Sequence, residues 1–432
     1  MAGRLILGVP LRQAYRNAFR HSRSIHFAMP RPRAMPIRVQ HASGSAPRRF
    51  KGTFMGNARV LFHKHPFSMT LATAIIFSGF ACIMWVNYIY QTYIIGAFHK
   101  YPEPVAKQLR KALYYTNMDL QPKEALKFYR KALEVSMEVG MDPFSDEIMG
   151  VKIQVAKMLE DIQQWPKAIE VLERVRHDNL VWLELRGDLE GNKLQRTNVL
   201  AKTVAVCVKL GDLYGHPAVW NRDMAQERVV WAVDTALKEK QRRQNNNVKE
   251  EDEGRWVTDE ELGASLESLA HSYEAKDQHY LAAPLFLQAL SLYPTKDCHS
   301  VVLMNNLASS LAQQSPRAAR EIQAYATSQN LDEQPAGPTV TRETMVENAE
   351  AWAQKALDVA ATIQPPIRNE ECDLGCAVAL HNLGEFAEMS KDVELAKKKY
   401  KEAVSLARAI GFEEGVEQSS ARLRELAKAG WS

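Results

Sequence analysis

One long stretch in the first quarter of the chain carries no charge and is mostly apolar. Between Lys64 and Lys100 there is no Lys, Arg, Asp or Glu, and positions 67–92 consist mainly of Ile, Ala, Phe, Met and Val. Roughly 20 such residues in a helix cross a bilayer core about 30 Å thick, because only a helix bonds its own backbone groups in lipid. Trp85 and Tyr88 lie near the end of the run, where aromatic rings favour the headgroup level. The pattern predicts one transmembrane helix at 67–92; the alternative is a buried helix of a soluble protein.

From residue 101 onward, apolar and small residues recur at helical spacing in pairs of segments. In the clearest pair, Ala270 in the first segment and Ala282 in the second are small enough to let two antiparallel helices touch. The expected packing residues of this pair are Leu266, Leu269, Ala270, Tyr273, Ala282, Phe286 and Ala289. This spacing resembles the tetratricopeptide (TPR) repeat, with Leu266 in place of the first Trp.

A second pair near the end of the chain has the same interval between its small residues. Its expected packing residues are Leu383, Gly384, Ala396, Tyr400 and Ala403. The alanines that mark second helices lie at 125, 168, 225, 282, 349 and 396, further apart than the 34 residues of the TPR family. We therefore expect an all-α fold, an irregular TPR-like helical-repeat solenoid over 101–432, with loop insertions at 241–254 and 316–343 and a solvating terminal helix at 413–428.

Charge divides the chain into a basic and an acidic part. The first 100 residues hold 14 of the 55 basic residues and none of the 51 acidic ones, so the remainder is negative. Residues 1–60 are rich in Arg, Ser and Ala, which is typical of a mitochondrial presequence followed by a disordered segment. Gly8 and Pro10 interrupt the apolar core that a secretory signal would need; a plain disordered basic tail is the alternative.

The charge distribution also predicts an orientation. Positive residues at 48–64 precede the apolar run, and positive flanks stay on the inner side of a membrane. With a presequence directed to the matrix, the N-terminus is expected in the matrix, the span in the mitochondrial inner membrane, and residues 101–432 in the intermembrane space. The negative charge of that last part disfavours nucleic-acid binding.

Catalytic motifs are missing from the sequence. It has no phosphate-binding P-loop, no dinucleotide-binding glycine turn, no H-E-x-x-H and no G-x-S-x-G. Cys372 and Cys376 would share a helix face and could oxidise or supply two metal ligands, although packing or free thiols are favoured because a structural zinc site needs four ligands. We expect no catalytic residue, metal, cofactor or small-molecule substrate.

Six polar residues on first helices are candidates for partner binding. They lie at helical spacing where repeat arrays offer a concave surface, and a merely solvated face is the alternative. These residues are Glu267, His271, Glu274, His381, Glu385 and Glu388. The Lys, Arg and Asn set with which some TPR domains grip chaperone tails is missing here.

The order of presequence, single span and irregular TPR domain resembles the fungal inner-membrane adaptor subunit of the i-AAA protease, over residues from about 60 to 430. The resemblance implies a non-catalytic adaptor that recognises unfolded or misassembled membrane proteins and delivers them to the protease. Two alternatives remain open. One is a TPR scaffold or assembly factor for an inner-membrane respiratory complex, and the other is an enzyme with a site around Cys372 and Cys376.

Overall fold

The computed structural model describes residues 62–89, 91–92, 98–294, 297–320 and 341–428. The presequence prediction for 1–60 and most of the expected insertion at 316–343 lie outside these residues. All regular structure in the described part of the chain is helical. The chain divides into two units, Met1–Ala106 and Lys107–Ser432, which we treat separately.

The first unit contains helix α3 (Pro66–Ile89), which carries no charged residue and has no buried side chain. The most apolar 18-residue window of this helix has a mean hydropathy of 2.0, and among the described helices α3 is the one long and apolar enough to cross a bilayer. Thr70 and Thr73 donate their hydroxyl protons to carbonyls one turn back, at 2.9 Å, so these polar groups are satisfied within the helix. The prediction placed the span at 67–92, and the helix ends at Ile89.

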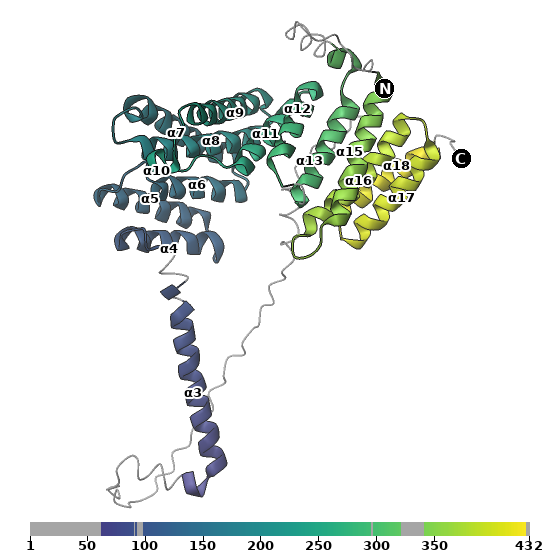
Figure 1. The fold of residues 1–432 in the computed structure, drawn as a ribbon. Coiled ribbons are helices and arrows are strands. Elements are labelled where there is room, and N and C mark those ends of the chain that lie inside the picture. The colour runs from purple at the N-terminus through teal and green to yellow at the C-terminus, as the bar shows by residue number, and fades with distance from the viewer. Residues whose placement is uncertain (1–61, 90, 93–97, 295–296, 321–340, 429–432) are drawn as a thin grey trace, which may run out of the picture. The chain divides into compact units, whose positions relative to one another are not determined.

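The second unit is a series of helices that follow one another in chain order (Figure 1). Helix α4 (Glu103–Asn117) begins just before the division. The helices after it are α5 (Pro122–Glu138), α6 (Asp146–Asp161), α7 (Trp165–Arg186), α8 (Lys193–Gly215), α9 (Arg222–Asn245), α10 (Glu250–Glu253), α11 (Asp259–Glu274), α12 (His279–Leu292), α13 (Cys298–Gln313), α15 (Arg342–Thr362), α16 (Glu370–Met389), α17 (Val393–Ala409) and α18 (Glu413–Lys428).

Most of these helices pack as hairpins of two. Helix α6 packs on α7, α8 on α9, α11 on α12, α13 on α15 and α16 on α17, and each first helix also contacts a helix of a neighbouring pair. The fold is therefore the all-α, TPR-like solenoid that the sequence predicts. Helix α18 covers the last pair and has the bounds expected for the terminal helix.

Small residues lie where the paired helices touch. Ala270 of α11 and Ala282 of α12 have no solvent exposure, and Phe286 fills the space beside them in the same core. The other expected packing residues are buried or half-buried: Leu266, Leu269, Tyr273, Ala289, Leu383, Gly384, Ala396, Tyr400 and Ala403. Tight contact at these positions fixes how each hairpin closes.

Two glycines show how close the helices come. A Cβ atom added to Gly384 of α16 would lie 2.7 Å from the ring of Tyr400 in α17. One added to Gly211 of α8 would lie 2.1 Å from a methyl group of Val229 in α9. Both distances are far shorter than a normal carbon contact, so glycine is required for this packing.

The two helices on either side of the expected insertion at 316–343 pack on each other as a pair. Ala308 of α13 and Ala349 and Ala353 of α15 lie in one buried cluster with Phe386 of α16. The expected loop at 316–343 is partly helical, because residues 316–320 are helical and α15 begins at Arg342.

The expected loop at 241–254 is also wrong in part. Helix α9 continues to Asn245, and α10 forms a further helical turn at Glu250–Glu253. The segment is polar and charged, which is typical of a loop, but several of its charges are paired inside the fold, as described below.

Replacing Ala282 with Leu should lower the free energy of unfolding by about 1–3 kcal/mol, because a larger side chain overpacks the fully buried contact with α11. Chemical denaturation of the full chain in mild detergent measures this loss. Ala351→Leu, at an exposed position of α15, is the control and should change stability little. Equal stability of the two variants would show that Ala282 does not lie at a tight contact.

Candidate functional site

Polar side chains join the first helices of successive pairs. Glu267 of α11, His299 of α13 and Glu371 of α16 form a continuous row: His299 Nε2 lies 3.0 Å from Glu267 Oε2, and His299 Nδ1 lies 2.8 Å from Glu371 Oε1. His271 and Glu274 extend the row along α11. We call these five residues the histidine–glutamate ladder.

Within α11 the ladder uses the spacing that the sequence analysis noted. His271 Nδ1 lies 3.0 Å from Glu274 Oε2, and its Nε2 lies 3.6 Å from Glu267 Oε1. Glu274 also accepts a hydrogen bond of 2.7 Å from the Ser310 hydroxyl of α13. Three of the six candidate groove residues thus contact one another and the next first helix.

The ladder holds both imidazoles in the charged form. Burial alone would lower the pKa of His271, but the hydrogen bonds and charges of Glu267 and Glu274 outweigh burial and raise it to about 10. The same balance, with Glu267 and Glu371 as partners, raises the pKa of His299 to about 10. Burial alone would raise the pKa of Glu267, yet contacts with both imidazoles lower it to about 2. The ladder is therefore an alternating row of charges near neutral pH.

The other three candidates lie on α16 and are tied to neighbouring helices. His381 Nδ1 is 2.8 Å from the Ser419 hydroxyl of α18, and its Nε2 is 3.5 Å from Glu385 Oε1. His381 and Glu385 are both buried. The sequence predicts surface residues here; that prediction is wrong for His381 and Glu385, which are buried where α16 meets its neighbouring helices.

Glu388 is held from two sides. It accepts hydrogen bonds from the Arg422 guanidinium of α18 and from the Tyr400 hydroxyl of α17. This carboxylate also contributes, after burial, to the raised pKa of Tyr400. Glu388 therefore stabilises the C-terminal end of the array, and its use by a partner stays a prediction.

The cysteine pairing differs from the one considered from sequence. Cys372 forms a disulfide with Cys298, 74 residues away, and joins the start of α16 to the start of α13. Cys376 is a free thiol. The i, i+4 spacing of Cys372 and Cys376 suggested a pair, but the partner of Cys372 comes from the neighbouring first helix.

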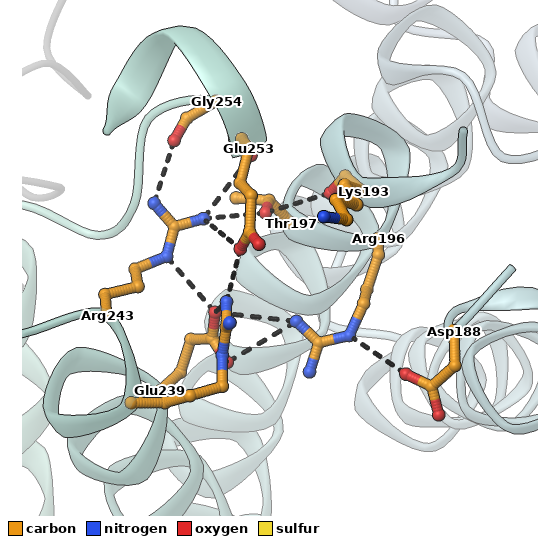
Figure 2. Close-up of polar contacts among 9 residues, drawn as sticks. Asp188, Lys193, Arg196, Thr197, Glu239, Arg243, Glu253 and Gly254 are labelled. Carbon is orange, nitrogen blue, oxygen red and sulfur yellow. Dashed lines mark hydrogen bonds and ion pairs between the residues drawn. The ribbon is translucent and has the colours of Figure 1, made fainter. Parts of the chain in front are cut away.

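A buried cluster of charges connects α8, α9 and α10 (Figure 2). Glu239 of α9 is almost fully buried, and three guanidinium groups surround it: Arg242 at 2.6 Å, Arg243 at 3.1 Å and Arg196 at 3.4 Å. Burial would raise the pKa of Glu239, but these cations keep it below its usual value. Arg242 also pairs with Glu253 of α10.

The same cluster fixes the chain after α9. Arg243 donates hydrogen bonds to the carbonyl of Gly254 at 2.9 Å and to the Thr197 hydroxyl of α8 at 2.7 Å, as Figure 2 shows. Gly254 has φ +78°, a conformation that favours glycine, and a Cβ there would lie 2.4 Å from Leu194. These contacts hold the turn at 250–254 against α8.

Several of these residues are not among the candidates that the sequence predicts. His299, Glu371 and Cys298 act across 32 to 74 residues of chain, and no local spacing signals such pairs. Glu239 and Arg243, in contrast, lie four residues apart on one helix, which was a usable sign of an ion pair.

A pocket of about 310 Å³ lies among α15, α16 and α17. Its lining combines apolar side chains with two carboxylates and one lysine: Glu347, Glu350, Ala351, Gln354, Leu383, Leu395 and Lys399. Burial, followed by the charges of Glu347 and Asp392, raises the pKa of Glu350. A cationic or apolar side chain fits this lining best.

The free thiols of Cys207 and Cys376 and the two ladder imidazoles are poorly suited to nucleophilic or base chemistry. Burial raises the pKa of the Cys207 thiol to about 12 and also raises that of Cys376, so both stay protonated near neutral pH. The ladder imidazoles are already protonated. Among the described residues, no group of three His, Cys, Asp or Glu is placed to hold a metal ion.

Antiparallel helix pairs with small residues at their contacts define a TPR-like helical-repeat protein, a class that binds other proteins through extended surfaces. The chain is 28% identical over 324 residues to a TPR repeat-containing protein of Schizosaccharomyces pombe (strain 972 / ATCC 24843), a match covering 73% of this chain and 76% of that relative. No protein-family model matches the chain.

Solved structures of TPR proteins are also similar. The C-terminal part of a TPR repeat-containing protein from Cytophaga hutchinsonii has 12% identity and a TM-score of 0.37, covering 81% of this chain and 94% of that one. A tetratricopeptide repeat protein from Parabacteroides merdae ATCC 43184 has 11% identity and a TM-score of 0.28, covering 74% and 100%. At such scores the fold assignment rests on the helix pairs of this chain.

Loss of the ladder charge should weaken the fold at high pH. The pKa of His271 and His299 rises from 6.5 to about 10, so their stabilisation is complete below pH 6.5 and is lost as the pH rises toward 10. The pKa of Glu267 falls from 4.5 to about 2, so its contribution is lost only as the pH falls through that lower range. The stability difference between the protein and His271→Gln should therefore shrink from pH 6.5 to 10.

Urea unfolding of both chains across this range measures the difference. Gln288→Ala, at an exposed position of α12, serves as the control and should show no such trend. A pH-independent difference for His271→Gln would show that His271 does not act through its charge.

Cys298→Ser should lower the free energy of unfolding by about 2–4 kcal/mol, because the disulfide restricts the unfolded chain. Urea unfolding with and without reductant measures this change. The matched variant Cys376→Ser should stay close to the unchanged protein, since Cys376 is free. If Cys376→Ser loses as much stability as Cys298→Ser, the pairing is different.

Proposed function

We propose that the chain is a non-catalytic, membrane-anchored adaptor that binds other proteins. The observation that carries this proposal is the order of elements: an uncharged 24-residue helix without buried side chains, followed by an array of paired helices. A single span can anchor the array, and the array supplies a binding surface. The similarity to a TPR repeat-containing protein supports the protein-binding part.

We further propose the mitochondrial inner membrane as its location, with the array in the intermembrane space. The Arg-rich, acid-free leader supports this address, and the positive residues before the span support the orientation. The Cys298–Cys372 disulfide is in line with an oxidising compartment outside the cytosol and matrix.

The finer proposal is delivery of unfolded or misassembled membrane proteins to the i-AAA protease. The pocket among α15, α16 and α17 is a better contact for an extended client than the ladder, because its carboxylates and apolar side chains line open space. Reversing Glu267 or Glu388 would break contacts between helices and so confound binding with folding. Glu350 allows the two effects to be separated.

A photo-crosslinker placed at Ala351 should capture unassembled inner-membrane proteins, and purification of the chain from mild detergent should recover the protease. Glu350→Lys should reduce client capture severalfold, because it places a positive charge beside Lys399 where a cationic client side chain would lie. Glu343→Lys, exposed at the start of the same helix and outside the pocket lining, is the matched control and should leave capture unchanged.

Isolated mitochondria that contain the chain test the orientation. With only the outer membrane ruptured, added protease should digest residues 98–428. Protection of the array until the inner membrane opens would refute the proposed orientation.

The capture experiment has its own contrary outcome. If Glu350→Lys captures as many client proteins as the unchanged chain, the pocket is not the client site. Recovery of a respiratory assembly intermediate in place of the protease would support the scaffold alternative.

A further inference from the structure

The first hairpin of the repeat array has a charge opposite to that of the rest. Residues 107–131, in α4 and α5, contain seven basic residues and two acidic ones, whereas the chain from 132 onward contains more acidic than basic residues. We call residues 107–131 the basic hairpin. It is a positive region within a negative repeat domain.

The charges of the basic hairpin share faces and are exposed. Lys123, Lys127 and Lys131 recur every four residues on α5, and Lys107 and Lys111 do so on α4, so each set lies along one side of its helix. All five side chains are exposed.

The two rows meet at one aromatic ring. The ammonium groups of Lys111 and Lys127 lie 5.3 and 5.6 Å from the centre of the Phe128 ring, and Tyr115 stacks on the same ring with centres 5.6 Å apart. Glu124 pairs with Lys127 at 3.0 Å, yet the Lys127 side chain is still 66% exposed. The lysines of α4 and α5 therefore form one continuous positive surface.

Large apolar side chains project into solvent from the last turn of α4 and from the loop that follows it. Met118 is 81% exposed, Leu120 66% and Tyr114 54%. Exposed apolar groups at the tip of a basic hairpin suit a bilayer interface, where they enter the headgroup region while lysine stems reach the phosphates.

We propose that the basic hairpin docks on the surface of an anionic phospholipid bilayer. The proposal rests on the proposed function, in which α3 spans that bilayer. Thirteen residues separate Ile89 from Glu103, so the chain can extend no more than about 45 Å between them. The short connection keeps the basic hairpin near the bilayer. The negative potential of the lipid surface then attracts the hairpin whenever it comes within a Debye length of that surface. Charge complementarity favours lipid over a protein partner of mixed charge.

The full chain, reconstituted through its span into nanodiscs, tests the proposal. A photo-crosslinker at Met118 should form lipid adducts in discs that contain phosphatidylglycerol and far fewer in discs of phosphatidylcholine alone. Replacing Lys123, Lys127 and Lys131 with Glu should reduce the adducts about tenfold or more, as should high salt. The matched variant Lys398→Glu, Lys401→Glu, Lys428→Glu, also at exposed positions, should leave the adduct yield unchanged. A crosslinker at Leu287 should not label lipid.

Each other outcome overturns one specific claim. Equal labelling in neutral and anionic discs, or labelling that survives reversal of the three lysines, refutes docking on anionic lipid. Adducts from Met118 to protein in place of lipid assign the basic hairpin to a protein partner and refute the proposal as well. A chain that fails to enter discs at all refutes the membrane anchor of the proposed function, and a chain that enters them without labelling lipid refutes only the docking.

Discussion

The close contact of small residues between paired helices is the constraint on which the rest of the array depends. Ala270 and Ala282 are fully buried in one core, and a methyl group added at Gly384 would lie only 2.7 Å from the ring of Tyr400. Each closed hairpin then packs on a helix of the neighbouring pair. Polar side chains can then pair between one hairpin and the next.

Those polar pairs change how the array can be used. Glu267, His299 and Glu371 alternate in charge across three first helices, and Glu388 reaches the terminal helix through Arg422. These side chains connect one repeat to the next, so their polar groups are already paired within the array. Recognition is accordingly expected at places that the array leaves open, such as the pocket beside Glu350.

Sequence reasoning succeeded where the signal is local. The residues around Ala282 and Gly384 lie within one hairpin, so their spacing alone indicates which positions touch. It failed where partners are remote or where composition misleads. His299 and Cys298 contact residues of another hairpin. Arg243 lies in a charged stretch whose composition is typical of a loop, but in the fold it pairs with Glu239 and with the carbonyl of Gly254. The spacing on α11 indicated that Glu267, His271 and Glu274 share one face, but it did not indicate their connection to His299 and Glu371. Their use by a partner stays a prediction.

The Cys298–Cys372 bond closes a covalent ring around α13, α15 and the long insertion between them. A peptide bond cut anywhere inside this ring leaves both halves of the chain linked through sulfur. A cut between α13 and α15 therefore leaves α15, α16, α17 and α18 joined to the rest of the repeat array.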